Sequence, residues 1–243
     1  MPLIEFRGVS YQIGARRILA GVNLAVEPGE CLVLLGRSGS GKSTLLKLAN
    51  GMLFPTSGEV LVEGRPTTQW DPIRLKRQTG YVIQEVGLFP HFTVAGNVGL
   101  VPRLEGHAPD RIRRRVDQLL DSVGLAPADF RARYPRQLSG GQRQRVGVAR
   151  ALAADPKLLL FDEPFGALDP VTRVELQRQF LDLRRDFGKT SMFVTHDVTE
   201  ALRLGTRIAL LASLGVELIA TPEAFRQSHS PEAQAFLGCL ADC

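Results

Sequence analysis

The chain contains 243 residues, of which 44% are hydrophobic and 23% are charged, a balance typical of a globular protein with a sizeable core. No apolar run approaches the roughly 20 residues that a membrane-spanning helix needs. The first ten residues also lack the charged head and apolar run of a signal peptide. We therefore expect a cytoplasmic protein, which must be held by a partner if it acts at a membrane.

The net charge of +5 is compatible with binding to nucleic acid, to an anionic membrane surface or to phosphate groups. The densest basic cluster lies in a helical pattern whose opposite face is apolar, so it predicts a solvated helix face. This cluster consists of Arg111, Arg113, Arg114 and Arg115. We favour a mildly basic phosphate-binding protein and expect no nucleic-acid partner.

The three cysteines form neither a disulfide framework nor a metal-binding pattern. Cys31 lies in an apolar run and is expected in the core. Cys239 and Cys243 are four residues apart, and only His229 is near them as a further metal ligand. So few cysteines are typical of a reducing compartment.

Strands dominate the first third of the predicted secondary structure, and strands alternate with helices in the last third. Apolar runs between Gly, Pro and Ser turns predict strands at 4–11, 22–26, 31–35, 59–62, 81–83, 157–161, 191–195, 207–212 and 217–220. Apolar periodicity and capping residues predict helices at 44–50, 109–123, 140–154, 170–188 and 198–204. Such alternation indicates a layered α/β core, and the helical pattern between 88 and 155 indicates an inserted subdomain.

A glycine-rich loop lies between the strand predicted at 31–35 and the helix predicted at 44–50. It fits the phosphate-binding pattern G-x-x-x-x-G-K-[ST] in full, with the sequence Gly36-Arg37-Ser38-Gly39-Ser40-Gly41-Lys42-Ser43. Glycines let successive backbone amides point at phosphate oxygens, and the positive end of a helix adds attraction. We expect this loop and Thr44 after it to bind a nucleotide. Lys42 is expected to reach the β- and γ-phosphates and Ser43 to bind magnesium.

The strand predicted at 157–161 ends in two carboxylates, Asp162 and Glu163. Many strands end in this way, but the phosphate-binding loop upstream makes the pair an indication of nucleotide hydrolysis. We expect Asp162 to reach the magnesium ion, usually through water. Glu163 is expected to position or deprotonate the attacking water.

A third motif narrows this broad class of nucleotide-binding proteins. The segment Leu138-Ser139-Gly140-Gly141-Gln142 matches the signature motif of ABC ATPases. Ser139 is expected to cap a helix whose glycines expose backbone amides at its positive end, which makes a second phosphate-binding group. The chain therefore resembles the ATP-binding subunits of ABC transporters, from about residue 3 to residue 237. The resemblance implies that this motif acts on ATP held by a second subunit, so that two chains, expected to be identical, enclose two nucleotides.

Four further motifs of the family also appear in the expected order along the chain. By resemblance, Tyr11 stacks on adenine, Gln84 senses magnesium and the attacking water, and His196 contacts the γ-phosphate. The run Gly166-Ala167-Leu168-Asp169 is similar to the loop that crosses the dimer interface. The resemblance implies that Asp169 is one of the residues that contact the nucleotide. Taken singly, Tyr11 is also compatible with an ordinary half-buried strand residue and His196 with a hydrogen-bonded histidine at a strand end.

The resemblance thus implies a complete ATP- and magnesium-dependent site. The catalytic residues it implies are Lys42, Gln84, Glu163 and His196. The magnesium ligands it implies are Ser43, Gln84 and Asp162.

The resemblance also implies a fold, the P-loop NTPase fold of the ABC ATPase type. This is an α/β fold with a RecA-like core, an N-terminal antiparallel β subdomain and an inserted α-helical subdomain. We expect one domain over residues 1–243. The core and β subdomain are expected at about 1–87 and 156–243, and the helical subdomain with the signature motif at about 88–155.

The segment that follows Gln84 resembles the ATPases of glycine betaine, choline and proline importers, through the runs at 80–84, 87–94, 97–98 and 100–102. In the family this segment docks the permease. The resemblance implies an osmoprotectant importer on the inner face of the cell membrane, with an integral membrane permease and a substrate-binding protein as partners. Many such ATPases carry a C-terminal pair of regulatory modules, for which these 243 residues leave no room, so we do not expect osmotic sensing by that route.

Three alternatives stay open. The first is the ATPase of another ABC system, such as an amino-acid importer or a lipid exporter. The second is an ABC ATPase that acts on nucleic acid or ribosomes, although such proteins usually carry two cassettes or a long coiled-coil insertion. The third is a cassette that binds ATP without hydrolysing it, and the presence of Lys42, Glu163 and His196 argues against it.

Overall fold

The computed structural model describes all residues except Glu85, Ala167, Asp242 and Cys243. Ala167 of the expected interface loop and Cys243 of the tail therefore lie outside the described residues. The chain forms two compact units. The first unit comprises residues 1–76 and 189–243, and the second unit comprises residues 77–188.

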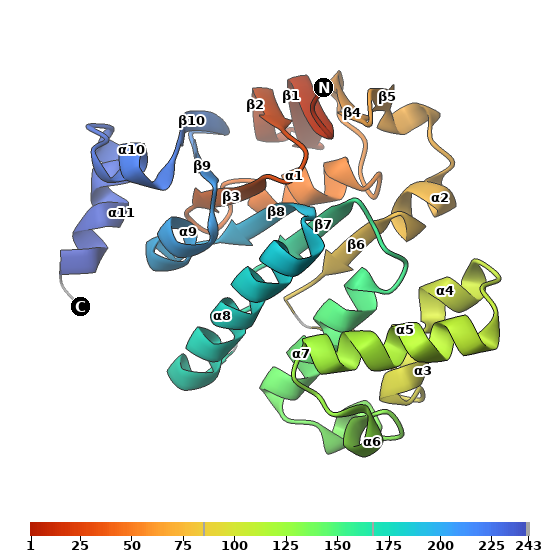
Figure 1. The fold of residues 1–243 in the computed structure, drawn as a ribbon. Coiled ribbons are helices and arrows are strands. Elements are labelled where there is room, and N and C mark those ends of the chain that lie inside the picture. The colour runs from red at the N-terminus through yellow and green to blue at the C-terminus, as the bar shows by residue number, and fades with distance from the viewer. Residues whose placement is uncertain (85, 167, 242–243) are drawn as a thin grey trace. The chain divides into compact units, whose positions relative to one another are not determined.

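The first unit begins with an antiparallel sheet of strand order β2-β1-β4-β5 (Figure 1). Ile4 and Phe6 of β1 are buried and alternate with more exposed neighbours, as in a sheet with one covered face. Strand β2 begins at Arg16 and not at residue 22 as predicted. The prediction missed its first residues because irregularities in the β1–β2 pairing interrupt the alternation of side chains. The elements of this part are β1 Ile4–Ile13, β2 Arg16–Val26, β4 Ser57–Val62, β5 Arg65–Pro66, the 3-10 helix η1 Thr67–Gln69 and α2 Pro72–Arg77.

The first unit also holds four strands in the order β10-β9-β3-β8. Strand β3 pairs in parallel with β8 and β9, whereas β10 is antiparallel to β9. All six residues of β3 are buried, as expected for the middle of a parallel sheet, and Cys31 lies there as predicted. The elements are β3 Cys31–Gly36, α1 Lys42–Ala49, β8 Thr190–Thr195, α9 Val198–Leu204, β9 Arg207–Ala212, β10 Gly215–Ala220, α10 Pro222–Arg226 and α11 Pro231–Ala241.

The second unit consists of two parallel strands, β6 and β7, and a set of helices. Every described element between residues 88 and 155 is helical. The grouping of this segment into a subdomain stays a prediction. The elements are β6 Thr79–Val82, α3 Val94–Val98, α4 Leu100–Leu104, α5 Pro109–Ser122, α6 Pro127–Phe130, the 3-10 helix η2 Pro135–Gln137, α7 Gly140–Leu152, β7 Leu158–Asp162 and α8 Pro170–Phe187.

Helix α5 has the basic outer face that its sequence predicts. Val116 and Leu119 are buried, whereas Arg114 is exposed. Arg115 departs from a purely solvated face, because its guanidinium donates a hydrogen bond to the Leu152 carbonyl at 3.0 Å. Within the described residues, none of the helices has both the length and the hydrophobicity that crossing a bilayer requires.

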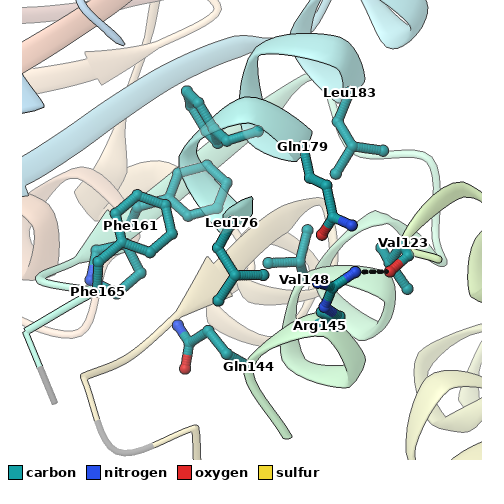
Figure 2. A pocket seen from close by; sticks show the side chains of 11 residues that line it. Val123, Gln144, Arg145, Val148, Phe161, Phe165, Leu176, Gln179 and Leu183 are labelled. Carbon is teal, nitrogen blue, oxygen red and sulfur yellow. Dashed lines mark hydrogen bonds between the residues drawn. The ribbon is translucent and has the colours of Figure 1, made fainter. Parts of the chain in front are cut away.

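A small apolar cavity lies in the second unit among residues of β7, α7 and α8 (Figure 2). Its volume of about 20 Å³ is enough for one water molecule. Gln144 and Gln179 are among the residues that line it, and Gln144 Nε2 and Gln179 Oε1 are buried and have no hydrogen-bond partner among the described residues. The wall of the cavity is almost wholly apolar, and such a wall gives a water molecule too few hydrogen-bond partners to hold it.

Asn97 of α3 organises the turn that precedes this helix. Its side chain is fully buried and donates hydrogen bonds to the carbonyls of Phe89, Phe92 and Thr93 at 3.0 to 3.2 Å. Its Oδ1 accepts a hydrogen bond from the Phe89 amide at 2.8 Å. One buried side chain thus holds the backbone of residues 89–93 together, although the carbonyls of Phe89 and Thr93 also accept from the amides of Phe92 and Asn97.

The substitution Asn97→Ala is expected to lower the free energy of unfolding by about 2–4 kcal/mol, because it removes all the hydrogen bonds of a fully buried side chain. Urea unfolding followed by circular dichroism measures this change. Asn23→Ala is the matched control: Asn23 also bonds to backbone groups, but it is exposed and water replaces it, so a loss below about 1 kcal/mol is expected. Equal losses in the two variants would contradict the role given to Asn97.

Candidate functional site

The predicted phosphate-binding loop joins β3 to α1 in the first unit. Gly41 is the N-cap of α1, with a φ of 95°, and a Cβ atom there would lie 2.6 Å from Leu19 Cδ2. A Cβ atom at Gly36 would lie 2.6 Å from the Leu211 carbonyl oxygen. Both positions therefore need glycine, and the loop can curl tightly over the start of α1.

Lys42 places a buried positive charge under this loop. Its side chain is 4% exposed, and its Nζ donates hydrogen bonds to the carbonyls of Gly36 at 2.7 Å and Arg37 at 2.8 Å. The first-turn amides of α1 add the positive end of a helix at the same place, and its N-cap has no side chain to cover them. The loop thus has the electrostatic character of an anion cradle.

The other loop residues differ in exposure. Ser38 and Gly39 are exposed, while Ser43 and Thr44 are half-buried on the first turn of α1. The Ser40 hydroxyl is buried and has no hydrogen-bond partner among the described residues.

The side chain of Arg37 is engaged outside the cradle. Its Nε lies 2.7 Å from Glu232 Oε1 in α11, and 71% of the side chain is exposed. This carboxylate raises the pKa of the guanidinium, mainly through the hydrogen bond. An exposed ion pair of this kind contributes little to stability.

Strand pairing brings His196 to the same sheet edge as the cradle. The parallel register of β3 and β8 sets Leu35 beside Thr195, so Gly36 and His196 leave neighbouring strands at their carboxyl ends. The His196 side chain is exposed.

Buried hydrogen bonds hold the turn that carries His196. The Thr195 hydroxyl donates a hydrogen bond to Glu200 Oε2 at 2.7 Å, and both side chains are buried. The same hydroxyl accepts from the Asp197 amide at 3.0 Å. Asp197 caps α9 by accepting from the amides of Thr199 and Glu200. This network was not predicted from the sequence, although Asp197 three residues before Glu200 is a helix-start pattern.

The antiparallel sheet connects Tyr11 to the cradle through Leu19 on the neighbouring strand. It is half-buried on β1 and pairs with Leu19 of β2. Leu19 is the residue whose side chain packs against Gly41. The first unit therefore brings together three predicted groups, namely Tyr11, the phosphate-binding loop and His196.

The predicted catalytic carboxylates lie in the second unit, next to Gln84. The parallel register sets Val82 of β6 beside Phe161 of β7, so Gln84, Asp162 and Glu163 follow neighbouring strand ends. A Cβ atom built on Gly166 would lie 3.8 Å from both Gln84 Nε2 and Glu163 Oε2. The Gln84 amide and the Glu163 carboxylate therefore both lie close to Gly166 at this edge.

Glu163 has an unusual backbone conformation. Its φ is 45°, in the left-handed region that residues with a Cβ atom seldom adopt. The Gly166 amide donates a hydrogen bond to the Glu163 carbonyl at 3.2 Å, which helps to hold the turn. Strained backbone of this kind is concentrated at functional sites.

Tyr81 is a site residue that the sequence pattern assigned only to a strand. Its hydroxyl donates a hydrogen bond to Asp162 Oδ2 at 3.2 Å. Burial raises the pKa of the Tyr81 hydroxyl well above its ordinary value, and the charge and hydrogen bond of Asp162 raise it further. Tyr81 therefore stays protonated and orients the carboxylate. A polar-tipped aromatic residue on an otherwise apolar strand was the available signal.

The signature residues begin α7 with a reciprocal cap. The Gln142 amide donates to Ser139 Oγ at 3.2 Å, and the Ser139 amide donates to Gln142 Oε1 at 2.9 Å. The side chains of Ser139 and Gln142 are thus bonded to the helix start itself, which leaves the amides of Gly140 and Gly141 at the positive helix end.

The start of α7 lies against the start of α8. A Cβ atom at Gly141 would lie 2.6 Å from Thr172 Cγ2, and one at Gly140 would lie 3.8 Å from Leu168 Cδ2. Asp169 caps α8, because its side chain accepts from the Thr172 amide. This hydrogen bond lowers the pKa of the Asp169 carboxyl.

A hollow of about 370 Å³ connects these parts of the second unit. Residues of the segment after β6, of the α7 start and of the segment before α8 line it, among them Gln84, Gly140, Pro164 and Leu168. The second unit therefore brings together Gln84, the carboxylate pair, the signature residues and the start of α8.

Comparisons with known proteins identify the family. Residues 19–166 match the family model described as ABC transporter. The chain is 50% identical over 202 residues to the osmoprotectant import ATP-binding protein OsmV of Salmonella typhimurium, which covers 83% of this chain and 53% of that protein. It is 42% identical over 226 residues to the glycine betaine/carnitine/choline transport ATP-binding protein OpuCA of Bacillus subtilis, which covers 93% of this chain and 59% of that protein.

A solved structure shares the fold. The dimeric post-hydrolysis state of the ATP-binding cassette MJ0796 with ADP and Pi has a TM-score of 0.79 and 34% identity, and the match covers 90% of this chain and 98% of that one. The chain spans somewhat more than half the length of OsmV and OpuCA. Because the family match extends over more than half of the chain, and the fold agrees over nine-tenths of it, this chain belongs to the ABC transporter family and folds as an ATP-binding cassette.

Proposed function

We propose that this chain is the ATP-hydrolysing subunit of an ABC importer for a small osmoprotectant such as glycine betaine, choline or proline. The observation that carries the proposal is the 50% identity, over 83% of the chain, to an osmoprotectant import ATP-binding protein. The anion cradle of the first unit and the carboxylate edge of the second unit support the hydrolytic part of the proposal.

The cradle fits the triphosphate of ATP. Gly36 and Gly41 are placed where a Cβ atom would clash, the helix end is positive, and Lys42 is a buried cation. In this proposal the backbone amides of residues 36–44 bind phosphate oxygens, and Lys42 exchanges its carbonyl partners for the β- and γ-phosphates. Tyr11 stacks on the adenine ring.

The donor set also fits magnesium. The described residues contain no cluster of three or more His, Cys, Asp or Glu that would form an all-protein metal cage. Magnesium in nucleotide sites prefers a few protein oxygens together with phosphates and water. Ser43, Gln84 and Asp162 supply such oxygens, and Tyr81 orients the last of them. When bound, the ion neutralises charge that develops on the phosphates.

Hydrolysis in this proposal depends on Glu163 as general base. Its carboxylate accepts a proton from water as the water attacks the γ-phosphorus in line with the leaving ADP oxygen. Lys42 and His196 donate hydrogen bonds to the γ-phosphate and stabilise its charge. Gln84, beside Glu163, orients the water.

A second chain completes the site. The amides of Gly140 and Gly141 bind the γ-phosphate held by the cradle of the partner, and Ser139, Gln142 and Asp169 lie in the same interface. Two identical chains would thus enclose two ATP molecules. The MJ0796 cassette with ADP and Pi is itself dimeric, which supports this arrangement.

The remaining partners follow from the transport role. The segment at 87–97 meets an integral membrane permease, so the chain works as a peripheral subunit on the cytoplasmic face of the membrane. A substrate-binding protein delivers the solute to that permease.

Co-purification tests the proposed function. The tagged chain is expressed in its native host, the membranes are solubilised gently, and bound proteins are identified by mass spectrometry. An integral permease that stimulates ATP hydrolysis is expected. Recovery of only soluble proteins, ribosomes or nucleic acid would contradict the transport role.

The substitution Lys42→Met keeps the length of the side chain but removes its charge. We expect the affinity for ATP to fall by about 10- to 100-fold, because charge-assisted bonds to phosphate are lost. A fluorescent-nucleotide titration measures it. Lys47→Met, at an exposed position on the last turn of the same helix, is the matched control and should bind ATP as the unmodified chain does. Tight binding by the Lys42 variant would exclude Lys42 as the main phosphate cation.

The substitution Glu163→Gln should leave the affinity for ATP within about twofold and lower the hydrolysis rate at least 100-fold, since an amide cannot accept the proton of the attacking water. Phosphate release measures the rate. Glu175→Gln, an exposed position on α8, is expected to hydrolyse ATP normally. Normal turnover by the Glu163 variant would remove Glu163 from the catalytic role.

A further inference from the structure

Arg150 lies in the last turn of α7, the helix whose first residues form the signature motif. Its guanidinium donates two hydrogen bonds to backbone carbonyls, to Gly87 O at 2.7 Å and to Val86 O at 2.8 Å. These carbonyls belong to the segment directly after Gln84. One side chain therefore ties the end of the signature helix to the residues that lead from Gln84 toward residue 97.

Both hydrogen bonds of Arg150 have a charged donor. Hydrogen bonds from a charged donor are roughly twice as strong as neutral ones. The side chain is half-buried, and within the described part of the chain it pairs with no carboxylate. Burial lowers the pKa of its guanidinium, but an arginine side chain remains charged at neutral pH. The two carbonyls are thus what satisfies this charge, and its loss would free both of them.

Packing reinforces the same connection at two further points. A Cβ atom at Gly147 would lie 2.4 Å from Val86 Cγ1, so the Val86 side chain rests on the bare backbone of α7. A Cβ atom at Gly80 of β6 would lie 2.5 Å from the Ala151 carbonyl oxygen. The strand, the segment after Gln84 and the helix are therefore in contact along the C-terminal half of α7.

Another arginine of the same helix makes a comparable bond in a different place. Arg145 is also half-buried, and burial lowers the pKa of its guanidinium as well. Its Nη1 donates to the Val123 carbonyl at 3.0 Å, at the small cavity next to α8 (Figure 2). Among the residues that the structure describes, the polar partners of Arg145 include none from the segment after Gln84. A comparison of variants of the two arginines therefore distinguishes a general role in holding α7 from a specific connection to that segment.

We propose that Arg150 is a positioning residue that makes the segment 86–92 and the signature residues Ser139–Gln142 move as one body. A displacement that a permease imposes on this segment would then reach the signature motif through α7, and closure around ATP would reach the permease by the same route. The inference deepens the proposed function and rests on it, because it assigns the coupling between permease and nucleotide to one side chain.

Amide hydrogen exchange on the isolated full-length chain tests the connection without a permease. In the unmodified chain, ATP is expected to change exchange in peptides that cover 86–92 and 139–146. In Arg150→Gln, exchange at 86–92 should become about tenfold faster without ATP, and ATP should change exchange at 139–146 only. Arg145→Gln should keep both responses. Arg150→Lys, which retains the charge but only one compact donor group, should restore the response at 86–92 in part.

Steady-state kinetics on the complex with the co-purified permease supply the second readout. In Arg150→Gln the permease-stimulated kcat should fall about fivefold, while the KM for ATP and the basal rate of the isolated chain stay within about twofold. Arg145→Gln should retain the stimulation, even if it loses as much unfolding free energy.

The outcomes separate the two proposals. An unmodified chain that fails to bind ATP, or that binds no permease, contradicts the proposed function. If the unmodified chain does both, an ATP response at 86–92 that survives in Arg150→Gln contradicts the coupling role. The same conclusion follows if Arg145→Gln loses permease stimulation as completely as Arg150→Gln, because the effect would then come from α7 stability in general.

Discussion

Parallel strand pairing is the constraint on which the candidate site depends. In a parallel pair, both carboxyl ends lie at the same edge, so whatever residues follow the strands become neighbours. The pairing of Leu35 with Thr195 puts the phosphate cradle and His196 at one edge in the first unit. The pairing of Val82 with Phe161 puts Gln84 beside the carboxylates in the second unit. A register shift of one residue would separate these groups and turn side chains to the opposite face.

The two helix starts that the proposed function assigns to phosphate are built differently. Helix α1 begins at a glycine N-cap, so its first amides face the cradle without competition from a capping side chain. Helix α7 begins with Ser139 and Gln142 bonded to each other's backbone. This cap stabilises α7 in the isolated chain and restricts its anion-binding donors to the amides of the two glycines. The first arrangement suits deep binding of a polyphosphate, and the second suits a contact with one terminal phosphate.

Much of this organisation was predictable from the sequence, because it depends on local patterns. Strand β3 is buried on all sides and was visible as an unbroken apolar run, and the loop after it matches its motif at every position. The start of β2 was missed because bulges break the alternation of its side chains. The bond of Tyr81 to Asp162 was missed because it joins residues 81 positions apart, whose proximity depends on tertiary packing. The pair Thr195–Glu200 is local, but the helix-start pattern at Asp197 does not report which side chain the Thr195 hydroxyl contacts.

The composition of α7 explains how the signature helix is held. It is rich in glycine and alanine, which let β6 and Val86 approach its backbone closely but give little apolar side-chain area to pack. Arginines compensate, since Arg145 and Arg150 each donate to a backbone carbonyl of another segment, whereas Arg143 donates to Leu138 just before the helix start. Such bonds are directional, so they fix the helix to particular carbonyls and not merely to an apolar surface. A helix fastened in this way transmits a displacement of those carbonyls along its axis, whereas one held by apolar packing alone could slide and absorb it.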